Sequence, residues 1–168
     1  MLRVAAVRGD ELADETRRCL EAPREQGIEP CRRALALGPR AERAELLRRS
    51  LAGRLGSLGR WEEAAAVYRE SARVRPADGD AQLRAGSALL DGLNRAEEAL
   101  PYLREAVRLK PSDGRAHGLL AFALADAGRF PDAVAEFEAA LKLEPSYFER
   151  RPAARAAYEA ARSGKRWP

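Results

Sequence analysis

The chain has 168 residues, of which 46% are hydrophobic, 33% are charged and only 6% are aromatic. This length fits a single domain, and no apolar run approaches the roughly 18 residues that a membrane-spanning helix needs, so we expect no membrane span. The net charge is only +4, and residues 148–168 supply the excess with six basic and two acidic side chains, so the body of the chain lacks the strongly basic character of nucleic-acid-binding domains.

The two cysteines, Cys19 and Cys31, lie twelve residues apart and have no histidine cluster beside them. This pattern indicates neither a disulfide framework nor a zinc site, and we expect reduced, packed thiols. The segment from Met1 to Asp10 has too short an apolar core for a secretory signal. We therefore expect a cytoplasmic protein.

The N-terminal region is predicted to contain one helix and the remnant of a second. Residues 1–9 show no clear periodicity and are expected to be frayed. An acidic start and regularly spaced apolar residues predict a helix over residues 10–21, which ends before Pro23. Residues 27–39 look like the second half of a worn two-helix unit. We interpret residues 10–41 as a degenerate repeat that caps an array, because a terminal repeat must expose a polar outer face.

Three better copies of the two-helix unit follow, over residues 45–78, 80–113 and 114–147. In the third copy a first helical stripe ends at Gly128, and a second amphipathic run ends before Pro145. The landmarks of this copy recur upstream at offsets of 34 and 35 residues, and we place the one extra residue in the turn at residues 78–80. The recurring positions are Pro76, Pro111 and Pro145; Ala64, Ala99 and Ala133; Tyr68, Leu103 and Phe137; Leu55, Leu90 and Leu124; Ala52, Ser87 and Ala121; and Gly59, Asn94 and Gly128, the last three in turns where left-handed backbone is expected.

Small residues recur where two helices joined by a tight turn must approach closely. A 34-residue period with a small residue, a large residue four positions later and a terminal proline resembles the tetratricopeptide repeat (TPR) family over residues 45–147. The family's first-helix tryptophan is Arg48, Leu83 and His117 here. The resemblance implies an all-α fold, a right-handed α-solenoid of helix-turn-helix repeats, and a function as a protein-binding scaffold or adaptor.

The chain is predicted to end with a closing helix and a basic tail. Over residues 148–162, Ala154, Tyr158 and Ala161 form a stripe that would dock on the third copy. Residues 163–168 contain two basic residues and a tryptophan, and are expected to be a mobile tip.

In the TPR family the first helix of each pair lines a concave groove, and the resemblance implies the same here. Helical geometry then selects the residues that lie off the packing stripe. Arg49, Arg84 and Arg115 would pair with acidic groups of a partner segment, and Leu46, Leu119 and Phe122 would supply apolar contact. The full set of predicted groove residues is Leu46, Arg49, Gly53, Arg84, Ala88, Arg115, Leu119, Phe122 and Asp126.

Other functions have weaker support in the sequence. No glycine-rich phosphate loop, metal-spaced cluster or nucleophile with a base occurs, and the single histidine, His117, falls at a packing position, so we expect no enzyme, cofactor or metal. Nucleic-acid contact through the basic tail is the alternative to peptide binding. Self-association through the tail or the Trp61 region is a third possibility, and we expect a monomer or a weak homo-oligomer.

Overall fold

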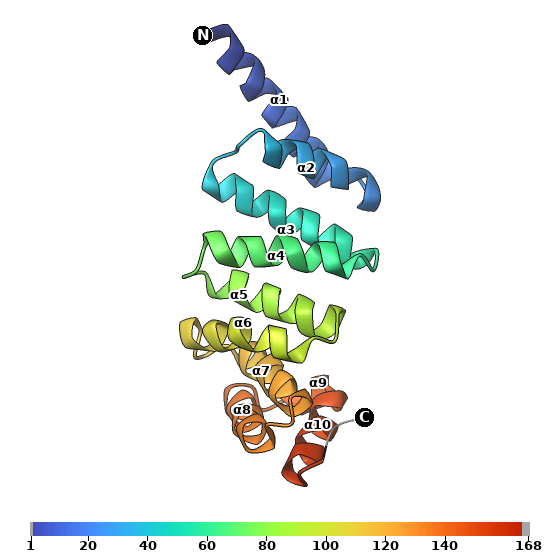
Figure 1. The fold of residues 1–168 in the computed structure, drawn as a ribbon, viewed down its shortest axis with the longest axis vertical. Coiled ribbons are helices and arrows are strands. Elements are labelled where there is room, and N and C mark those ends of the chain that lie inside the picture. Colours follow the sequence, from blue (N-terminus) through green and yellow to red (C-terminus); the bar gives the residue numbers. More distant parts are fainter. Residues whose placement is uncertain (1, 166–168) are drawn as a thin grey trace. The chain divides into compact units, whose positions relative to one another are not determined.

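The computed structural model describes residues 2–165, and for residues 2–8 it describes the backbone alone. Within that range every regular element is helical, which confirms the predicted all-α class (Figure 1). None of the described helices is long and apolar enough to cross a membrane. The chain divides into two compact units, Met1–Ser71 and Ala72–Pro168, and the division falls within helix α4 (Trp61–Val74).

The first unit begins with a helical hairpin. Helix α1 (Leu2–Glu21) starts well before the predicted Asp10, so the segment expected to be frayed is helical from Leu2 onward. A 3-10 turn, η1 (Arg24–Gly27), leads into α2 (Ile28–Ala36), which packs against α1. Helix α3 (Ala41–Ser57) and the first part of α4 complete the unit. The interpretation of residues 10–41 as a degenerate repeat stays a prediction.

The two cysteines form a disulfide, so the expectation of reduced thiols is wrong. Cys19 lies near the end of α1 and Cys31 near the start of α2, and the turn between them reverses the chain. Their Cα atoms are 4.5 Å apart, within the range that a disulfide spans, and both residues are fully buried. Sequence spacing alone did not reveal this contact, because it depends on how α1 and α2 face each other. An ion pair adds a second link, since Arg33 donates to both carboxylate oxygens of Glu15 at 3.0 and 3.2 Å.

Arg54 of α3 caps the C-terminal end of α1. Its guanidinium donates to the carbonyls of Cys19 and Ala22, both at 2.6 Å, and to that of Arg24 at 2.9 Å. These carbonyls have no partner within the helix, and the negative end of the helix dipole favours a cation there. Gly27 leaves room for this guanidinium, because a Cβ on Gly27 would lie 2.5 Å from the Arg54 Cζ. One side chain therefore fastens the hairpin end to α3.

The core of the first unit lies between α1, α2, α3 and the start of α4. The Trp61 ring packs on Gly56, where a Cβ would lie only 2.8 Å from the ring, so the ring sits directly on the backbone of α3. The buried members of this core are Cys19, Ile28, Cys31, Ala34, Leu47, Leu51, Ala52, Leu55 and Ala64.

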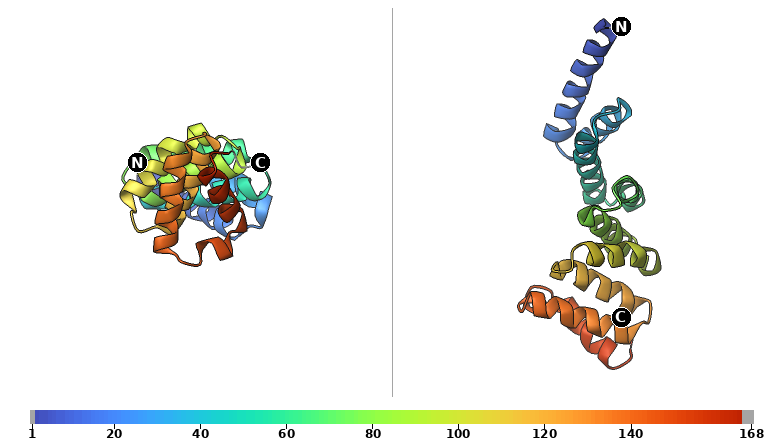
Figure 2. Two further views of the ribbon diagram at one scale, coloured as in Figure 1. Left: turned by 90° about the horizontal axis from the view of Figure 1, so that it is seen from below. Right: turned by 90° about the vertical axis from the view of Figure 1, so that its left-hand side faces the viewer.

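The second unit contains two helical hairpins and a C-terminal closure. Figures 1 and 2 show α7 and α8 side by side, and α5 and α6 form the preceding pair. The elements are α5 (Gly79–Ser87), the π-helical turn η2 (Ala88–Gly92), α6 (Ala96–Leu109), α7 (Gly114–Asp126), α8 (Phe130–Leu143), α9 (Tyr147–Arg150) and α10 (Pro152–Arg162).

The turns inside the three hairpins have the predicted backbone. Gly59, Asn94 and Gly128 have φ angles of +74°, +53° and +75°, in the left-handed region that favours glycine and asparagine. Each turn is followed by a second helix of 14 residues, which begins at Trp61, Ala96 or Phe130. The spacing of these second helices agrees with the sequence offsets of 35 and 34.

The hydrogen bonds across these turns show where the extra residue lies. In the third copy the N–H of Arg129 donates to the carbonyl of Leu124, five residues back, at 2.8 Å. In the second copy the N–H of Arg95 donates to the carbonyl of Leu89, six residues back, also at 2.8 Å. The additional residue is therefore accommodated in η2, because a π-helical turn holds one residue more than an α-turn. Its predicted place, in the turn before α5, is wrong.

The starts of α5 and α7 support this register. Asp78 and Asp113 are equivalent N-caps, each accepting two backbone N–H groups of the first turn. Gln82 and His117 then take matching places, since each approaches the carbonyl of the loop proline six residues before it, at 3.1 and 3.0 Å. Leu83, the predicted counterpart of His117, lies one residue further along.

The insertion also changes which residues pack in α5 and η2. Leu89, which is 1% exposed, takes the packing place that the sequence assigned to Leu90. Gly86 replaces Ser87 as the small residue, and a Cβ on Gly86 would lie 2.5 Å from the Cγ of Leu103, so α5 and α6 approach closely there. Leu90, which is 7% exposed, therefore does not take the place that Leu124 has in the third copy.

The C-terminal closure has a different form from the single helix predicted over residues 148–162. The short helix α9 ends at Arg150 and α10 begins at Pro152, where proline is favoured at a helix start. Aromatic rings join the closure to the third hairpin, since the Phe137 ring lies edge-on to those of Phe122, Phe148 and Tyr158 at centroid distances of 5.4, 6.1 and 6.0 Å. These contacts form the main core of the unit's C-terminal half.

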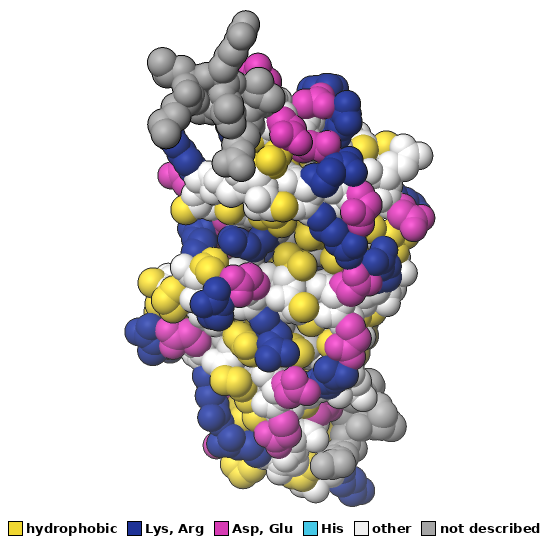
Figure 3. Space-filling model, turned by 45° about the horizontal axis from the view of Figure 1, so that its top comes forward, with side chains coloured by type: hydrophobic (Ala, Val, Ile, Leu, Met, Phe, Trp, Pro, Cys, Tyr) yellow, Lys and Arg dark blue, Asp and Glu magenta, His cyan; other side chains and the backbone are white. Residues whose placement is uncertain are grey.

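Charged side chains of both signs are interspersed on the face shown in Figure 3. Many charged side chains of the described residues form pairs three positions apart in the sequence, such as Arg60 with Glu63 and Arg108 with Glu105, each at 2.6 Å. Exposed pairs of this kind contribute little to stability. They do keep the surface field near neutral, as the composition of the repeats indicated.

Candidate functional site

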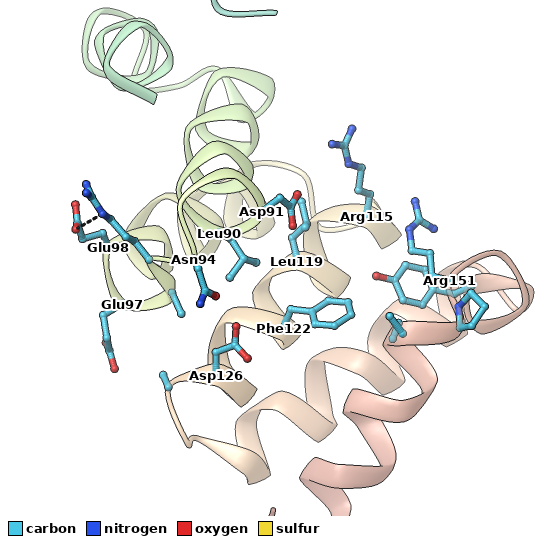
Figure 4. Close-up of a pocket in the computed structure, with 17 residues that line it drawn as sticks. Leu90, Asp91, Asn94, Glu97, Glu98, Arg115, Leu119, Phe122, Asp126 and Arg151 are labelled. Atoms are coloured by element: carbon cyan, nitrogen blue, oxygen red, sulfur yellow. Dashed lines mark ion pairs between the residues drawn. The ribbon is translucent and has the colours of Figure 1, made fainter. Parts of the chain in front are cut away.

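A cavity of about 1160 Å³ in the second unit is the main candidate site (Figure 4). One face of α7 forms its floor, η2 and the start of α6 form one wall, and α9 with the start of α10 forms the other. All of its lining residues belong to the second unit.

The floor is a single stripe of α7. Arg115, Leu119, Phe122 and Asp126 are separated by four, three and four residues, which places them on one side of an α-helix. The stripe has a cation at the N-terminal end of α7, two apolar residues in the middle and an acid at the C-terminal end. Phe122 is fixed by its edge contact with the buried Phe137.

Tyr147 forms part of the opposite wall. Its ring packs on the backbone of α7 at Gly118, where a Cβ would lie 2.9 Å from the tyrosine Cε2 and closer still to the hydroxyl. Only 1% of the residue is exposed, and burial raises the pKa of its hydroxyl above the ordinary 10.0. The phenol is therefore neutral at physiological pH and retains a proton to donate.

Two arginines gather at one end of the cavity (Figure 4). The Arg151 guanidinium lies over the Tyr147 ring, 4.7 Å from its centroid, and its Nη1 is 3.6 Å from a carboxylate oxygen of Glu144. Within the part of the chain that the structure describes, no carboxylate forms an ion pair with Arg115. This end can therefore accept an anionic group by charge-assisted hydrogen bonds.

The π-helical turn supplies the near wall. Leu90 adds an apolar contact beside Leu119, and Asp91 holds a carboxylate at the edge of the cavity, where Ser87 Oγ donates to its Oδ2 at 2.8 Å (Figure 4). Both cavity-lining residues belong to the segment that contains the extra residue of the second copy. The insertion therefore brings side chains to the site that the other two hairpins do not have.

The structure brings together four of the nine predicted groove residues: Arg115, Leu119, Phe122 and Asp126 all line the cavity. The other five lie elsewhere in the chain.

Of those five, Leu46, Arg49 and Gly53 are exposed on α3 of the first unit, Arg84 is half-buried on α5, and Ala88 is only 3% exposed. In the observed register the second and third predicted arginines, on α5 and α7, do not occupy equivalent positions. These five residues stay predicted contacts.

Sequence reasoning missed most of the other lining residues, among them Leu90, Tyr147 and Arg151. Leu90 could have been found by counting the residues between Leu89 and Asn94, which exceed by one those in the corresponding segments of the other copies. The last two gave no signal, because the closure folds back over α7 in a way that residue spacing does not encode.

Two further sequence expectations concern single features. His117 packs as expected, between Glu136, whose Oε2 lies 2.6 Å from Nδ1, and the carbonyl of Pro111. In the basic tail, Lys165 is exposed, and Arg166, Trp167 and Pro168 lie outside the described residues.

Comparisons with known proteins agree with the hairpin architecture. Models of the tetratricopeptide repeat match residues 49–114 and 92–158. None of the curated proteins matches the chain.

Several solved structures share the fold. One is a crystal structure of the MamA protein, with a TM-score of 0.79 and 15% identity, covering 93% of this chain and 83% of that one. Residues 41 to the end of MamA from Desulfovibrio magneticus RS-1 give a TM-score of 0.71 and 20% identity, covering 94% and 90%. YrrB, described as a TPR protein with an unusual peptide-binding site, gives 0.69 and 22%, covering 83% and 68%.

These solved structures are all less than 25% identical to the chain and therefore support its fold rather than its ligand. The two repeat models together span residues 49–158, about two thirds of the sequence. Because this span contains the helix-turn-helix pairs with the 34-residue period, the chain belongs to the tetratricopeptide repeat family.

Proposed function

We propose that the cavity of the second unit binds a peptide segment of a partner protein, and that the chain serves as a non-catalytic interaction scaffold. The observation that carries this proposal is the stripe of α7, where Leu119 and Phe122 form an apolar floor between Arg115 and Asp126. A concave site with an apolar centre and a few polar groups at its edge is typical of ligand recognition. The helices hold these side chains in fixed positions, so little ordering is needed on binding.

The chemistry of the lining residues favours recognition over catalysis. The cavity contains carboxylates, arginines, an asparagine and a buried phenol, and among its lining residues there is no histidine, cysteine, serine or lysine. Nucleophilic catalysis needs a nucleophile beside a positioned base, which this set does not supply. The family likeness agrees, and YrrB, one of the similar structures, is a TPR protein with an unusual peptide-binding site.

A site of this size supports modest affinity. A dissociation constant on the order of micromolar corresponds to about −8 kcal/mol, which a few buried apolar contacts and one or two charged hydrogen bonds can provide. The predicted contacts of Leu46, Arg49, Gly53 and Arg84 are not needed for this proposal.

The disulfide indicates the kind of cellular compartment in which the chain functions. Disulfides persist in oxidising compartments and are rare where the cytosol keeps thiols reduced. The buried bridge between Cys19 and Cys31 therefore favours an oxidising compartment over the cytoplasm that the sequence led us to expect. The cell fraction that contains the native chain tests this point.

Selection from a random heptapeptide display library tests the proposed function. Purified wild-type chain should enrich a family of related peptides, and these should bind a Leu119→Glu variant about tenfold more weakly, because the substitution places a charge on the apolar floor. Leu143→Glu is the matched control, since Leu143 is 42% exposed on α8 and does not line the cavity. Both variants must keep the helical circular dichroism of the wild type. Equal binding to both would refute the assignment to this cavity.

A further inference from the structure

The cavity has opposite charges at its two ends. Along α7, Arg115 and Asp126 are eleven residues apart, which corresponds to about 16 Å at 1.5 Å per residue. Arg151 strengthens the basic end, and Glu97, at the start of α6, lies with Asp126 toward the acidic end (Figure 4). The apolar floor lies between them. A ligand that matches this pattern must itself be polar along its length.

The basic end is suited to a carboxylate. Arg115 has no ion-pair partner among the described residues, and Arg151 is held in place by its contact with the Tyr147 ring. A guanidinium binds a carboxylate through two parallel hydrogen bonds, and the neutral Tyr147 hydroxyl can add a third donor at this end. An acidic side chain is therefore favoured here and a basic one is disfavoured.

The acidic end has the opposite preference. The carboxylates of Asp126 and Glu97 come from two neighbouring helices, and Asn94 lies near them (Figure 4). Carboxylates accept hydrogen bonds from lysine or arginine and repel a second acid. On the same wall, Arg95 and Glu98 form an ion pair at 3.8 Å and add no net charge, whereas Asp91 lies nearer Arg115 (Figure 4). A basic side chain of the ligand is therefore favoured at this end.

The cavity is large enough for a short extended segment. An extended chain, with a cross-section of about 4.8 by 10 Å, occupies roughly 770 Å³ over about 16 Å and fits the volume of about 1160 Å³. At about 3.3 Å per residue, 16 Å corresponds to five residues.

We propose that the cavity recognises an extended segment of about five residues, with an acidic side chain held by Arg115 and Arg151, apolar side chains on Leu119 and Phe122, and a basic side chain held by Asp126 and Glu97. This inference rests on the proposed peptide-binding function and adds the chemistry and the orientation of the ligand. It differs from recognition of a uniformly acidic segment, because a second acid at the α6 end would meet two carboxylates.

The same heptapeptide selection tests the charge pattern through the sequences that it enriches. Wild-type chain should enrich peptides in which an acidic and a basic residue are separated by three or four positions, with leucine, phenylalanine or another large apolar residue between them. An Arg115→Gln, Arg151→Gln variant should lose the preference for the acidic residue and keep that for the basic one. An Asp126→Asn, Glu97→Gln variant should do the reverse. The acid-to-amide changes keep the side-chain length, and the arginine-to-glutamine changes shorten the side chain without adding bulk, so the fold should be preserved.

The outcomes separate this inference from the proposed function. Enriched peptides that lose binding in Leu119→Glu but show no acid–base spacing would leave the peptide site in place and overturn the charge pattern. Enrichment that is the same in both charge variants would also overturn it. A dimer in light scattering that Leu119→Glu abolishes would assign the cavity to a second copy of the chain, and would overturn both.

Discussion

The contact between Gly118 and Tyr147 predicts that a single methyl group will destabilise the second unit. In Gly118→Ala the new Cβ would lie 2.9 Å from the tyrosine Cε2 and closer still to the hydroxyl, well inside the range of real carbon contacts. The ring has little room to move away, because it is 1% exposed and packs beside Phe148 and beneath Arg151. The clash must therefore be relieved by shifting α7 or α9.

The size of the effect follows from two opposing contributions. Replacing glycine by alanine within a helix gains about 1 kcal/mol, because alanine loses less backbone entropy. Overpacking a core costs about 1–3 kcal/mol, and the depth of this overlap favours the upper end of that range. The net loss should be about 1–2 kcal/mol. With a urea m-value of about 2 kcal/mol/M, the midpoint should fall by roughly 0.5–1 M.

Urea unfolding followed by circular dichroism measures this loss, and two variants control for it. Gly114→Ala lies on the same helix, its Cβ would meet neighbours at 3.5 Å, and it should not lower the midpoint. In a Tyr147→Ala background the overlap disappears, so Gly118→Ala should then raise stability. If Gly118→Ala costs as much with Ala at position 147 as with Tyr147, the reasoning is refuted.

Three further predictions concern the helix ends, the disulfide and the alkaline limit. Arg54→Ala should lower the free energy of unfolding in urea by about 2–4 kcal/mol, because it leaves several carbonyls at the end of α1 without a donor. Arg49→Ala on the same helix should have almost no effect. Similar losses in the two variants would contradict the capping role. Replacing Cys19 and Cys31 together by serine should cost about 3 kcal/mol, and thiol titration of the denatured native chain should find no free thiol; two free thiols would disprove the bridge. Burial raises the folded-state pKa of Tyr147, so its contribution to stability is complete below the ordinary pKa of 10.0 and is lost as the pH rises through the folded-state pKa. Tyr147→Phe should therefore flatten the decline of the urea midpoint at alkaline pH. An unchanged slope would contradict this.

The architecture was predictable because each hairpin needs the same kinds of residue at the same positions in order to pack. The small residues Ala64, Ala99 and Ala133 recur where two helices approach, and Gly59 and Gly128 recur where the backbone must be left-handed. These requirements are local, so residue type and spacing are enough to express them. They do not depend on how distant segments meet.

Most features that the sequence missed depend on contacts between segments. The pairing of Cys19 with Cys31 follows from the facing of α1 and α2, and the wall made by Tyr147 follows from the return of the closure onto α7. The position of the extra residue was open for another reason. A turn before α5 and a π-turn after it give the same count between Pro76 and Asn94, and the hydrogen bond from Arg95 to Leu89, together with the equivalent N-caps of α5 and α7, distinguishes them.

For the same reasons, the floor of the candidate site was predictable and its walls were not. Arg115, Leu119, Phe122 and Asp126 share one face of one helix, which periodicity alone reveals. The wall opposite them comes from other elements. A stripe can be predicted from spacing, but a cavity needs the position of every surrounding element.

The π-turn of the second copy also indicates how such a scaffold can acquire new recognition properties. A residue added between Leu89 and Asn94 is absorbed before the chain reverses, so the paired helix that follows keeps its place and its buried contacts. Only the side chains at the rim change. Lengthening or shortening hairpin tips is therefore a route by which evolution or protein engineering can diversify ligand preference while leaving the stacked framework unaltered.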